Sequence, residues 1–228
     1  MVYNNYYILI INYYLFWGDC FLKTCIIFSG GTVTGTEYLP EITSDTFVIS
    51  ADGGYLNALK FNIIPNMCLG DFDTLTIDIN SQCEVVKFPP EKDDTDTMLC
   101  IKKAISMGYT DIYIYGALGG RFDHSIANVQ SMEYSLRYNV TCHIVDAKNI
   151  VTMQRESSRV YSSNKDFKYL SILSVSESAE VSAEGLKYPL EHTNLVRNFP
   201  LGVSNETLVD IFRITVHSGT ILVIYSKD

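Results

Sequence analysis

The sequence predicts an N-terminal, doubly wound, mostly parallel α/β domain followed by a C-terminal antiparallel β-sandwich. Up to about residue 147, short β-branched or aromatic runs alternate with helical patterns. Beyond that point helical periodicity disappears, and short β-type runs recur between Ser, Asn and Gly residues. We therefore place the α/β domain at 23–147, the β-sandwich at 148–228, and a separate N-terminal extension at 1–22.

In the first domain, each predicted strand is a short apolar run bounded by Gly or polar residues. These strands are 25–28, 47–50, 67–69, 85–88, 111–115 and 140–145. The predicted helices are 55–61, 94–107 and 123–136, and the last two carry apolar residues at helical spacing on one face. Strands separated by helices predict a parallel sheet that is covered on both faces.

The second domain is predicted from strands alone. They are 150–154, 160–161, 169–175, 195–196, 207–215 and 220–225. No helical pattern separates them, so we expect antiparallel pairing.

The first 22 residues differ from the rest. Their apolar run, 6–17, is shorter than a membrane span, and no basic residue precedes Lys23 as a signal peptide requires. We interpret this segment as an upstream extension, translated from before a non-AUG start at Leu22. A peripheral membrane anchor is the alternative, and mass spectrometry of the native N-terminus distinguishes the two.

Composition restricts the class of protein. Among 228 residues, 17 basic and 26 acidic side chains give a net charge of −9, which argues against a protein that coats nucleic acid. Charged residues at 19% and aromatic residues at 12% argue against a disordered chain. The six cysteines form no C-x-x-C motif and lie mostly in apolar runs, which predicts reduced thiols in a cytoplasmic protein. The four histidines lack the spacing of zinc ligands.

Polar segments follow the predicted parallel strands, where an α/β sheet binds its ligands. They are Ser29-Gly30-Gly31, Ala51-Asp52-Gly53-Gly54, Gly70-Asp71-Phe72-Asp73-Thr74, Lys92-Asp93-Asp94-Thr95-Asp96 and Gly119-Gly120-Arg121-Phe122-Asp123-His124. Clustered carboxylates repel one another unless a cation lies among them, and Mg²⁺ binds both carboxylates and phosphate oxygens. Gly-rich turns bring backbone N–H groups to phosphates. The set predicts a phosphoryl or pyrophosphoryl transfer site.

Each segment also has a purely structural explanation. Asp71 and Asp73 are common types of turn residue, and the carboxylates of 93–96 favour the start of the following helix. Asp123 fits a helix cap with Arg121 as a surface ion-pair partner. The joint occurrence of five such segments at one predicted sheet edge favours a functional site.

On these residues the chain closely resembles the thiamine pyrophosphokinase (thiamine diphosphokinase) family. The resemblance extends from about residue 24 to 225 and includes two segments of the second domain, Gly185-Leu186-Lys187-Tyr188-Pro189-Leu190 and Gly202-Val203-Ser204-Asn205-Glu206. It implies an enzyme that transfers pyrophosphate from ATP, its co-substrate, to thiamine, giving thiamine diphosphate and AMP. It also implies a homodimer, with each active site formed between the α/β domain of one subunit and the β domain of the other.

The resemblance further implies roles for individual residues. Asp71, Asp73 and Asp96 would hold Mg²⁺ and, with Arg121, form the catalytic set. Tyr188, Ser204 and Asn205 would contact thiamine. The residues expected around ATP or supporting the metal are Gly30, Gly31, Asp52, Gly53, Lys92, Asp93, Thr95, Arg121, Asp123 and His124. Tyr188 stands where some members have Trp, and Thr74 stands where Ser is usual.

Three other interpretations remain open at this stage. Asp71-Phe72-Asp73-Thr74-Leu75 suggests a haloacid-dehalogenase-type, Mg²⁺-dependent phosphatase, but position 75 lacks the hydroxyl that such a site requires. A non-catalytic sensor of thiamine diphosphate or nucleotide is the second. The third is an enzyme that uses another alcohol-bearing heterocycle, because small differences in a pocket discriminate weakly.

Overall fold

The computed structural model describes residues 23–72, 78–89 and 93–228. The chain divides into two compact units, of which the first ends at Met153 and the second begins at Gln154. The division falls within β7 (Asn149–Arg155). The extension expected at 1–22 lies outside the described residues. No helix in the described parts of the chain is long and apolar enough to cross a bilayer.

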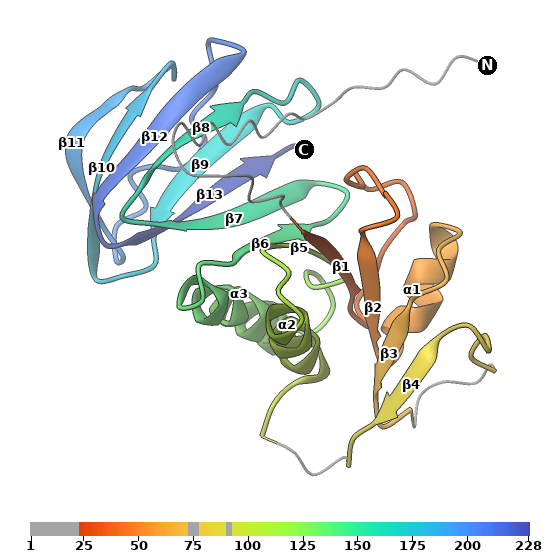
Figure 1. Cartoon of the computed structure of the whole chain (residues 1–228). Coiled ribbons are helices and arrows are strands. Elements are labelled where there is room, and N and C mark those ends of the chain that lie inside the picture. Colours follow the sequence, from red (N-terminus) through yellow and green to blue (C-terminus); the bar gives the residue numbers. More distant parts are fainter. Residues whose placement is uncertain (1–22, 73–77, 90–92) are drawn as a thin grey trace, which may run out of the picture. The chain divides into compact units, whose positions relative to one another are not determined.

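The first unit is built on a mostly parallel sheet with strand order β4-β3-β2-β1-β5-β6-β7 (Figure 1). Strands β1 to β6 pair in parallel, and β7 runs antiparallel to β6. The strands before β7 are β1 (Thr24–Phe28), β2 (Phe47–Ala51), β3 (Met67–Gly70), β4 (Glu84–Lys87), β5 (Asp111–Tyr115) and β6 (Thr141–Val145). The parallel sheet predicted from the sequence is confirmed.

Three helices connect these strands. They are α1 (Gly54–Lys60), α2 (Asp96–Ser106) and α3 (Phe122–Leu136). Figure 1 shows α2 and α3 together on one face of the sheet and α1 on the other. From β1 the chain first proceeds toward β4 and then returns through α2 to β5, so right-handed crossovers place the helices on opposite faces. The topological switch point therefore lies between β1 and β5.

The core of this unit is formed by the side chains of strands that are buried on both faces of the sheet. Ile26, Ile27, Ile49, Ile112 and Ile144 are completely buried. A parallel strand covered by helices on both sides has no solvent face, so its sequence is a continuous apolar run rather than an alternating one. Each such side chain stabilises the fold by about 1.5–3 kcal/mol relative to its exposed state.

The second unit is antiparallel. One sheet has the order β11-β10-β12-β8, and β13 pairs with β9 and packs against β10. The strands are β8 (Ser158–Ser162), β9 (Tyr169–Ser174), β10 (Ser178–Glu184), β11 (Leu190–Val196), β12 (Ile211–Ser218) and β13 (Thr220–Ser226). The predicted class, α/β followed by an antiparallel β-sandwich, is confirmed.

Strand prediction in this unit missed β10, covered only the end of β11 and gave wrong bounds for β12. Strand β10 was not predicted, because its buried residues alternate but two of the three are small alanines. The strand expected at 207–215 begins only at Ile211, since Thr207 forms an isolated bridge with Leu186 instead.

The loop after β1 is stabilised by a buried carboxylate. Glu37 is 7% exposed and accepts hydrogen bonds from the backbone N–H groups of Thr34 at 2.6 Å, Gly35 at 2.8 Å and Thr36 at 3.0 Å. Burial disfavours the charged form, but these hydrogen bonds hold the pKa of the Glu37 carboxyl below its usual value. Its stabilising contribution is therefore complete above the unfolded-state pKa and is lost as the pH falls through the folded-state pKa.

We expect Glu37→Gln to lower the free energy of unfolding by about 1–2 kcal/mol at pH 7, because an amide presents an NH₂ donor to one of these N–H groups. Urea unfolding of both proteins at neutral pH and at about pH 3.5 measures this difference. The difference should shrink in acid. A deficit of equal size at both pH values would contradict the assigned role of the ionised carboxylate.

Candidate active site

The loops after β1 and β5 meet at the switch point. The backbone N–H of Ser29 donates to Tyr115 O at 2.8 Å, and that of Gly31 donates to Gly116 O at 2.9 Å. Gly116 has φ +67°, and a Cβ there would lie 2.6 Å from Ser29 O. A Cβ on Gly31 would likewise overlap Gly116 O. Glycine is required at both positions because the two backbones pass in contact.

A buried asparagine from α1 fixes the loop after β1. The Nδ2 of Asn57 donates to Ser29 O at 2.7 Å and to Gly31 O at 2.6 Å, and the residue is 5% exposed. These bonds satisfy two carbonyl groups that no strand pairs, so the loop keeps one shape. Asn57 was not among the residues expected from the sequence. The available signal was a polar residue on the otherwise apolar face of a short helix.

The loops after β2 and β3 are also adjacent. The backbone N–H of Asp52 donates to Leu69 O at 2.7 Å, and a Cβ on Gly70 would lie 2.9 Å from Asp52 Cβ. Asp52 has φ 42° and Phe72 has φ 61°, both left-handed conformations that are unusual outside glycine. Such residues concentrate at functional sites. Asp52 and Asp71 thus lie at neighbouring strand ends, as the sequence predicted, whereas Asp73 lies outside the described residues.

The start of α2 is joined to the same edge of the sheet. The hydroxyl groups of Ser29, after β1, and Thr97, in the first turn of α2, lie 2.8 Å apart, and both residues are buried. Thr95 is the N-cap, and its Oγ1 accepts from Met98 N at 3.2 Å. Asp96 is the first helical residue and Asp93 is exposed, whereas Lys92 lies outside the described residues.

The loop after β5 ends in an ion pair at the start of α3. Arg121 Nε lies 3.1 Å from Asp123 Oδ1, and Arg121 Nη2 lies 2.5 Å from Asp123 Oδ2. The hydrogen bond from Arg121 lowers the pKa of the Asp123 carboxyl. His124 donates its backbone N–H to the same carboxylate at 3.0 Å. A guanidinium carries more N–H donors than this pair uses, so Arg121 retains donors for a phosphate.

The carboxylates at this edge are chemically suited to a hard cation. Asp71 directly follows β3, and Asp96 begins α2, so both belong to the ligand edge of the sheet. Carboxylate oxygens are the ligands that Mg²⁺ takes in proteins, together with water and substrate phosphate. Within the described residues, no three His, Cys, Asp or Glu side chains form a group that could hold a metal ion.

In the second unit, an exposed aromatic side chain is presented by a buried amide. Asn205 Oδ1 accepts from Tyr188 N at 3.0 Å, and Asn205 Nδ2 donates to Tyr188 O at 2.7 Å. The Tyr188 residue itself is 61% exposed. Ser204 has φ 59°, and its backbone N–H donates to Ser171 Oγ at 3.0 Å. The Asn205 side chain therefore fixes the backbone of Tyr188. The sequence did not indicate this structural role of Asn205.

Comparison with known proteins identifies the family. A model described as the catalytic domain of thiamin pyrophosphokinase matches residues 39–144, and one described as its vitamin B1 binding domain matches residues 148–221. The chain belongs to the thiamine pyrophosphokinase family. The family resemblance drawn from the sequence motifs is confirmed.

Individual relatives agree with the assignment to the thiamine pyrophosphokinase family. The chain is 28% identical over 217 residues to thiamine pyrophosphokinase of Bacillus subtilis, covering 91% of this chain and 100% of the relative. A crystal structure of the Bacillus subtilis protein superposes with a TM-score of 0.82 at 27% identity, covering 90% of this chain and 100% of that one. Thiamin pyrophosphokinase from Geobacillus thermodenitrificans gives a TM-score of 0.78 at 27% identity, with 90% and 98% covered.

Proposed function

We propose that this protein is a thiamine diphosphokinase, which transfers the terminal pyrophosphate of ATP to thiamine and releases AMP. The proposal rests on one observation: the loops after the parallel strands meet at the switch point of the sheet. The same chain matches both family models. At this switch point the Gly30-Gly31 turn, Asp52, Asp71 and the start of α2 follow neighbouring parallel strands. This combination would place backbone amides that can bind phosphate beside carboxylates.

The triphosphate of ATP is proposed to bind across these loops. Backbone N–H groups at Gly30 and Gly53 and in the first turn of α2 are suitable phosphate donors, whereas Gly31, whose N–H donates to Gly116 O, shapes the turn. Arg121 would bind phosphate oxygens, with Asp123 fixing its guanidinium and with His124 beside it. Lys92, Asp93 and Thr95 complete the proposed nucleotide set.

Asp71 and Asp96, with Asp73, are proposed to hold Mg²⁺. When bound, this ion spreads the charge of the reacting phosphates. Asp52 would support the site from the adjacent strand end, where its backbone is fixed to β3.

The proposed reaction is an in-line displacement at the β-phosphorus. The thiamine hydroxyl oxygen forms a bond to that phosphorus, the bond to the oxygen that bridges to the α-phosphate breaks, and AMP leaves. The site would lower the barrier mainly by holding the thiamine hydroxyl oxygen about 3–3.5 Å from the β-phosphorus and in line with the bond that breaks. We assign the hydroxyl proton to a carboxylate of the site rather than to His124. Arg121 neutralises charge on the transferred group and on the leaving phosphate.

Thiamine is proposed to stack on the ring of Tyr188, with Ser204 and Asn205 shaping the surrounding turn. We expect Tyr188→Ala to raise the KM for thiamine about 3- to 10-fold, the loss of one aromatic stack, while the KM for ATP stays unchanged. The variant should fold, because Asn205 bonds only the backbone of residue 188. Initial rates against thiamine at saturating ATP measure the effect. Tyr188→Phe is the matched control, and an equal rise in KM there would contradict stacking.

We also propose a homodimer whose active sites combine the α/β unit of one subunit with the β unit of the other. Exposed large apolar side chains on the β unit support the proposal, because a partner subunit could bury them. Those that are more than half exposed include Phe199, Leu201, Leu208 and Ile211. At thiamine concentrations below its KM, mixing Asp71→Asn subunits with the weakened Tyr188→Ala subunits should recover activity beyond that of the Tyr188→Ala subunits alone, with up to about a quarter of the wild-type rate coming from the intact sites, because only heterodimers contain an intact site. No recovery after subunit exchange would contradict shared sites.

A reducing compartment, the cytoplasm, is the proposed location. The described cysteines Cys25, Cys68, Cys83, Cys100 and Cys142 are buried thiols. Burial raises the pKa of Cys68 to about 12, so this thiol stays protonated and unreactive.

The direct test of the function is AMP formation by the purified protein with ATP and Mg²⁺, in the presence and absence of thiamine. We expect AMP to form only with thiamine, in step with thiamine diphosphate. Release of inorganic phosphate without AMP would indicate a phosphatase. Binding of thiamine or ATP with no product would indicate a sensor, and either result would overturn the proposal.

A further inference from the structure

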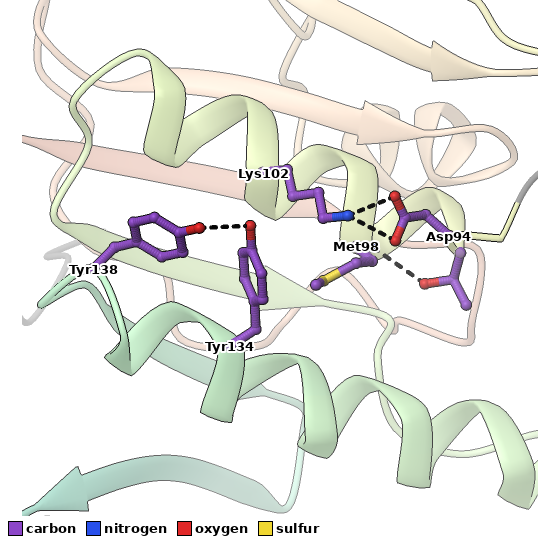
Figure 2. Close-up of polar contacts among 6 residues, drawn as sticks. Asp94, Met98, Lys102, Tyr134 and Tyr138 are labelled. Carbon is purple, nitrogen blue, oxygen red and sulfur yellow. Dashed lines mark hydrogen bonds and ion pairs between the residues drawn. The ribbon is translucent and has the colours of Figure 1, made fainter.

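The segment that begins α2 is held from two sides. On its buried side, Thr97 contacts Ser29 through their hydroxyl groups at 2.8 Å. On its outer side, both carboxylate oxygens of Asp94 accept from Lys102 Nζ, Oδ1 at 2.9 Å and Oδ2 at 2.7 Å (Figure 2). Asp93, Thr95 and the first helical residue lie between or beside these two attachments. Their backbone positions therefore depend on both.

The lysine that makes the outer contact is itself positioned by α3. Figure 2 shows Lys102 running back along α2 toward Asp94, with Tyr134 of α3 and Tyr138, which follows α3, nearby. Lys102 Nζ lies 5.6 Å from the centroid of the Tyr134 ring, and the Tyr134 hydroxyl lies 3.1 Å from that of Tyr138. A cation at this distance is attracted by an aromatic ring. Side chains on a helix point toward its N-terminus, so Lys102 can span the two turns to Asp94.

This ion pair has little to contribute to folding. The side chains of Lys102 and Asp94 are 38% and 31% exposed, and such pairs add little stability because solvent screens them. The pair has a clear local consequence instead. Three carboxylates occur within 93–96. Lys102 neutralises one of them, that of Asp94, and holds it beside α2. Without Lys102, Asp94 would be able to turn toward the edge of the sheet and repel a bound polyphosphate.

We propose that Lys102 is a positioning residue for the nucleotide site and acts through Asp94. By binding Asp94 it fixes the 93–96 segment, so that the start of α2 and Asp96 face the triphosphate. The identity of the ligand rests on the proposed function, whereas the mechanical role of the Lys102–Asp94 pair does not.

The test uses α,β-methylene ATP, in which a methylene group replaces the oxygen between the α- and β-phosphates, so the bond that breaks in the proposed reaction cannot be cleaved. Calorimetry on the full chain measures the dissociation constant of its Mg²⁺ complex. We expect Lys102→Met and Asp94→Ala each to weaken binding of the analogue roughly 3- to 10-fold. Because the two residues act through one contact, the double variant should bind the analogue as tightly as each single variant does. Lys102→Arg, which keeps the charge and reach, should restore most of the affinity. Lys103→Met, a neighbouring lysine on the same helix, is the matched control and should bind as the wild type does.

Several results would overturn the inference. They are wild-type affinity in Lys102→Met, additive losses in the double variant, or an equal loss in Lys103→Met. Melting temperatures should agree among all variants; a loss of affinity that follows a lower melting temperature would assign Lys102 to folding instead. A wild-type chain that does not bind the analogue would also overturn it. Binding without thiamine-dependent AMP would refute the proposed function alone.

Discussion

Asp71→Asn is expected to lower kcat/KM for thiamine pyrophosphorylation by about 10²–10³-fold, because it removes a charge that opposes the build-up of negative charge on the reacting phosphates. Asparagine keeps the size of the side chain and one acceptor oxygen, so the turn after β3 should survive. The apparent Mg²⁺ requirement should rise as well, since an amide oxygen is a weaker ligand than a carboxylate.

Initial rates over a range of Mg²⁺ concentrations measure both effects. Asp45→Asn, an exposed aspartate in the loop before β2, is the matched control and should leave the rates unchanged. Turnover near that of the wild type at saturating Mg²⁺ would contradict the assignment of Asp71 as a metal ligand.

Asn57→Asp is expected to have the largest effect on stability, lowering the free energy of unfolding by about 3–5 kcal/mol at pH 7. The Nδ2 group donates to two backbone carbonyls, Ser29 O and Gly31 O. A carboxylate has no donor and would be buried against two partial negative charges. The folded-state pKa of the new carboxyl should therefore be raised, so that the loss becomes smaller as the pH falls and the group is protonated.

Urea unfolding at pH 7 and at about pH 5 measures this effect. Exposed Asn198→Asp in the turn after β11 is the control for the same chemical change and should shift stability by less than about 0.5 kcal/mol. A loss for Asn57→Asp that grows as the pH falls would show that the Asn57 hydrogen bonds do not determine the stability of this loop.

The strands of the first unit could be predicted because full burial leaves a simple pattern in the sequence. Strands such as β1 and β5 are continuous apolar runs followed by Gly or Ser, and each ends at the ligand edge of the sheet. The loops that hold Asp52, Asp71 and Arg121 could be placed at that edge for the same reason. Strand β10 was missed because Ala179 and Ala183 bury little area, although they alternate correctly.

The contacts that hold the candidate site together were beyond sequence reasoning. Asn57 to Gly31 and Thr97 to Ser29 join residues far apart in the chain through single hydrogen bonds. Periodicity identifies which face of an element is buried, but it does not identify which polar atom on that face meets a particular carbonyl. Asn205 illustrates the same point, since the family resemblance implied a thiamine contact for it, and nothing in the sequence indicated that its amide also bonds the backbone of Tyr188.

The proposed reaction moves a pyrophosphoryl group, rather than a single phosphoryl group, from ATP to thiamine. Its most direct test uses ATP labelled at the β-phosphorus, with thiamine, Mg²⁺ and the purified protein. We expect the label to appear in thiamine diphosphate, with one unlabelled AMP formed for each product molecule. Label retained in ADP, with thiamine monophosphate as the thiamine product, would contradict it.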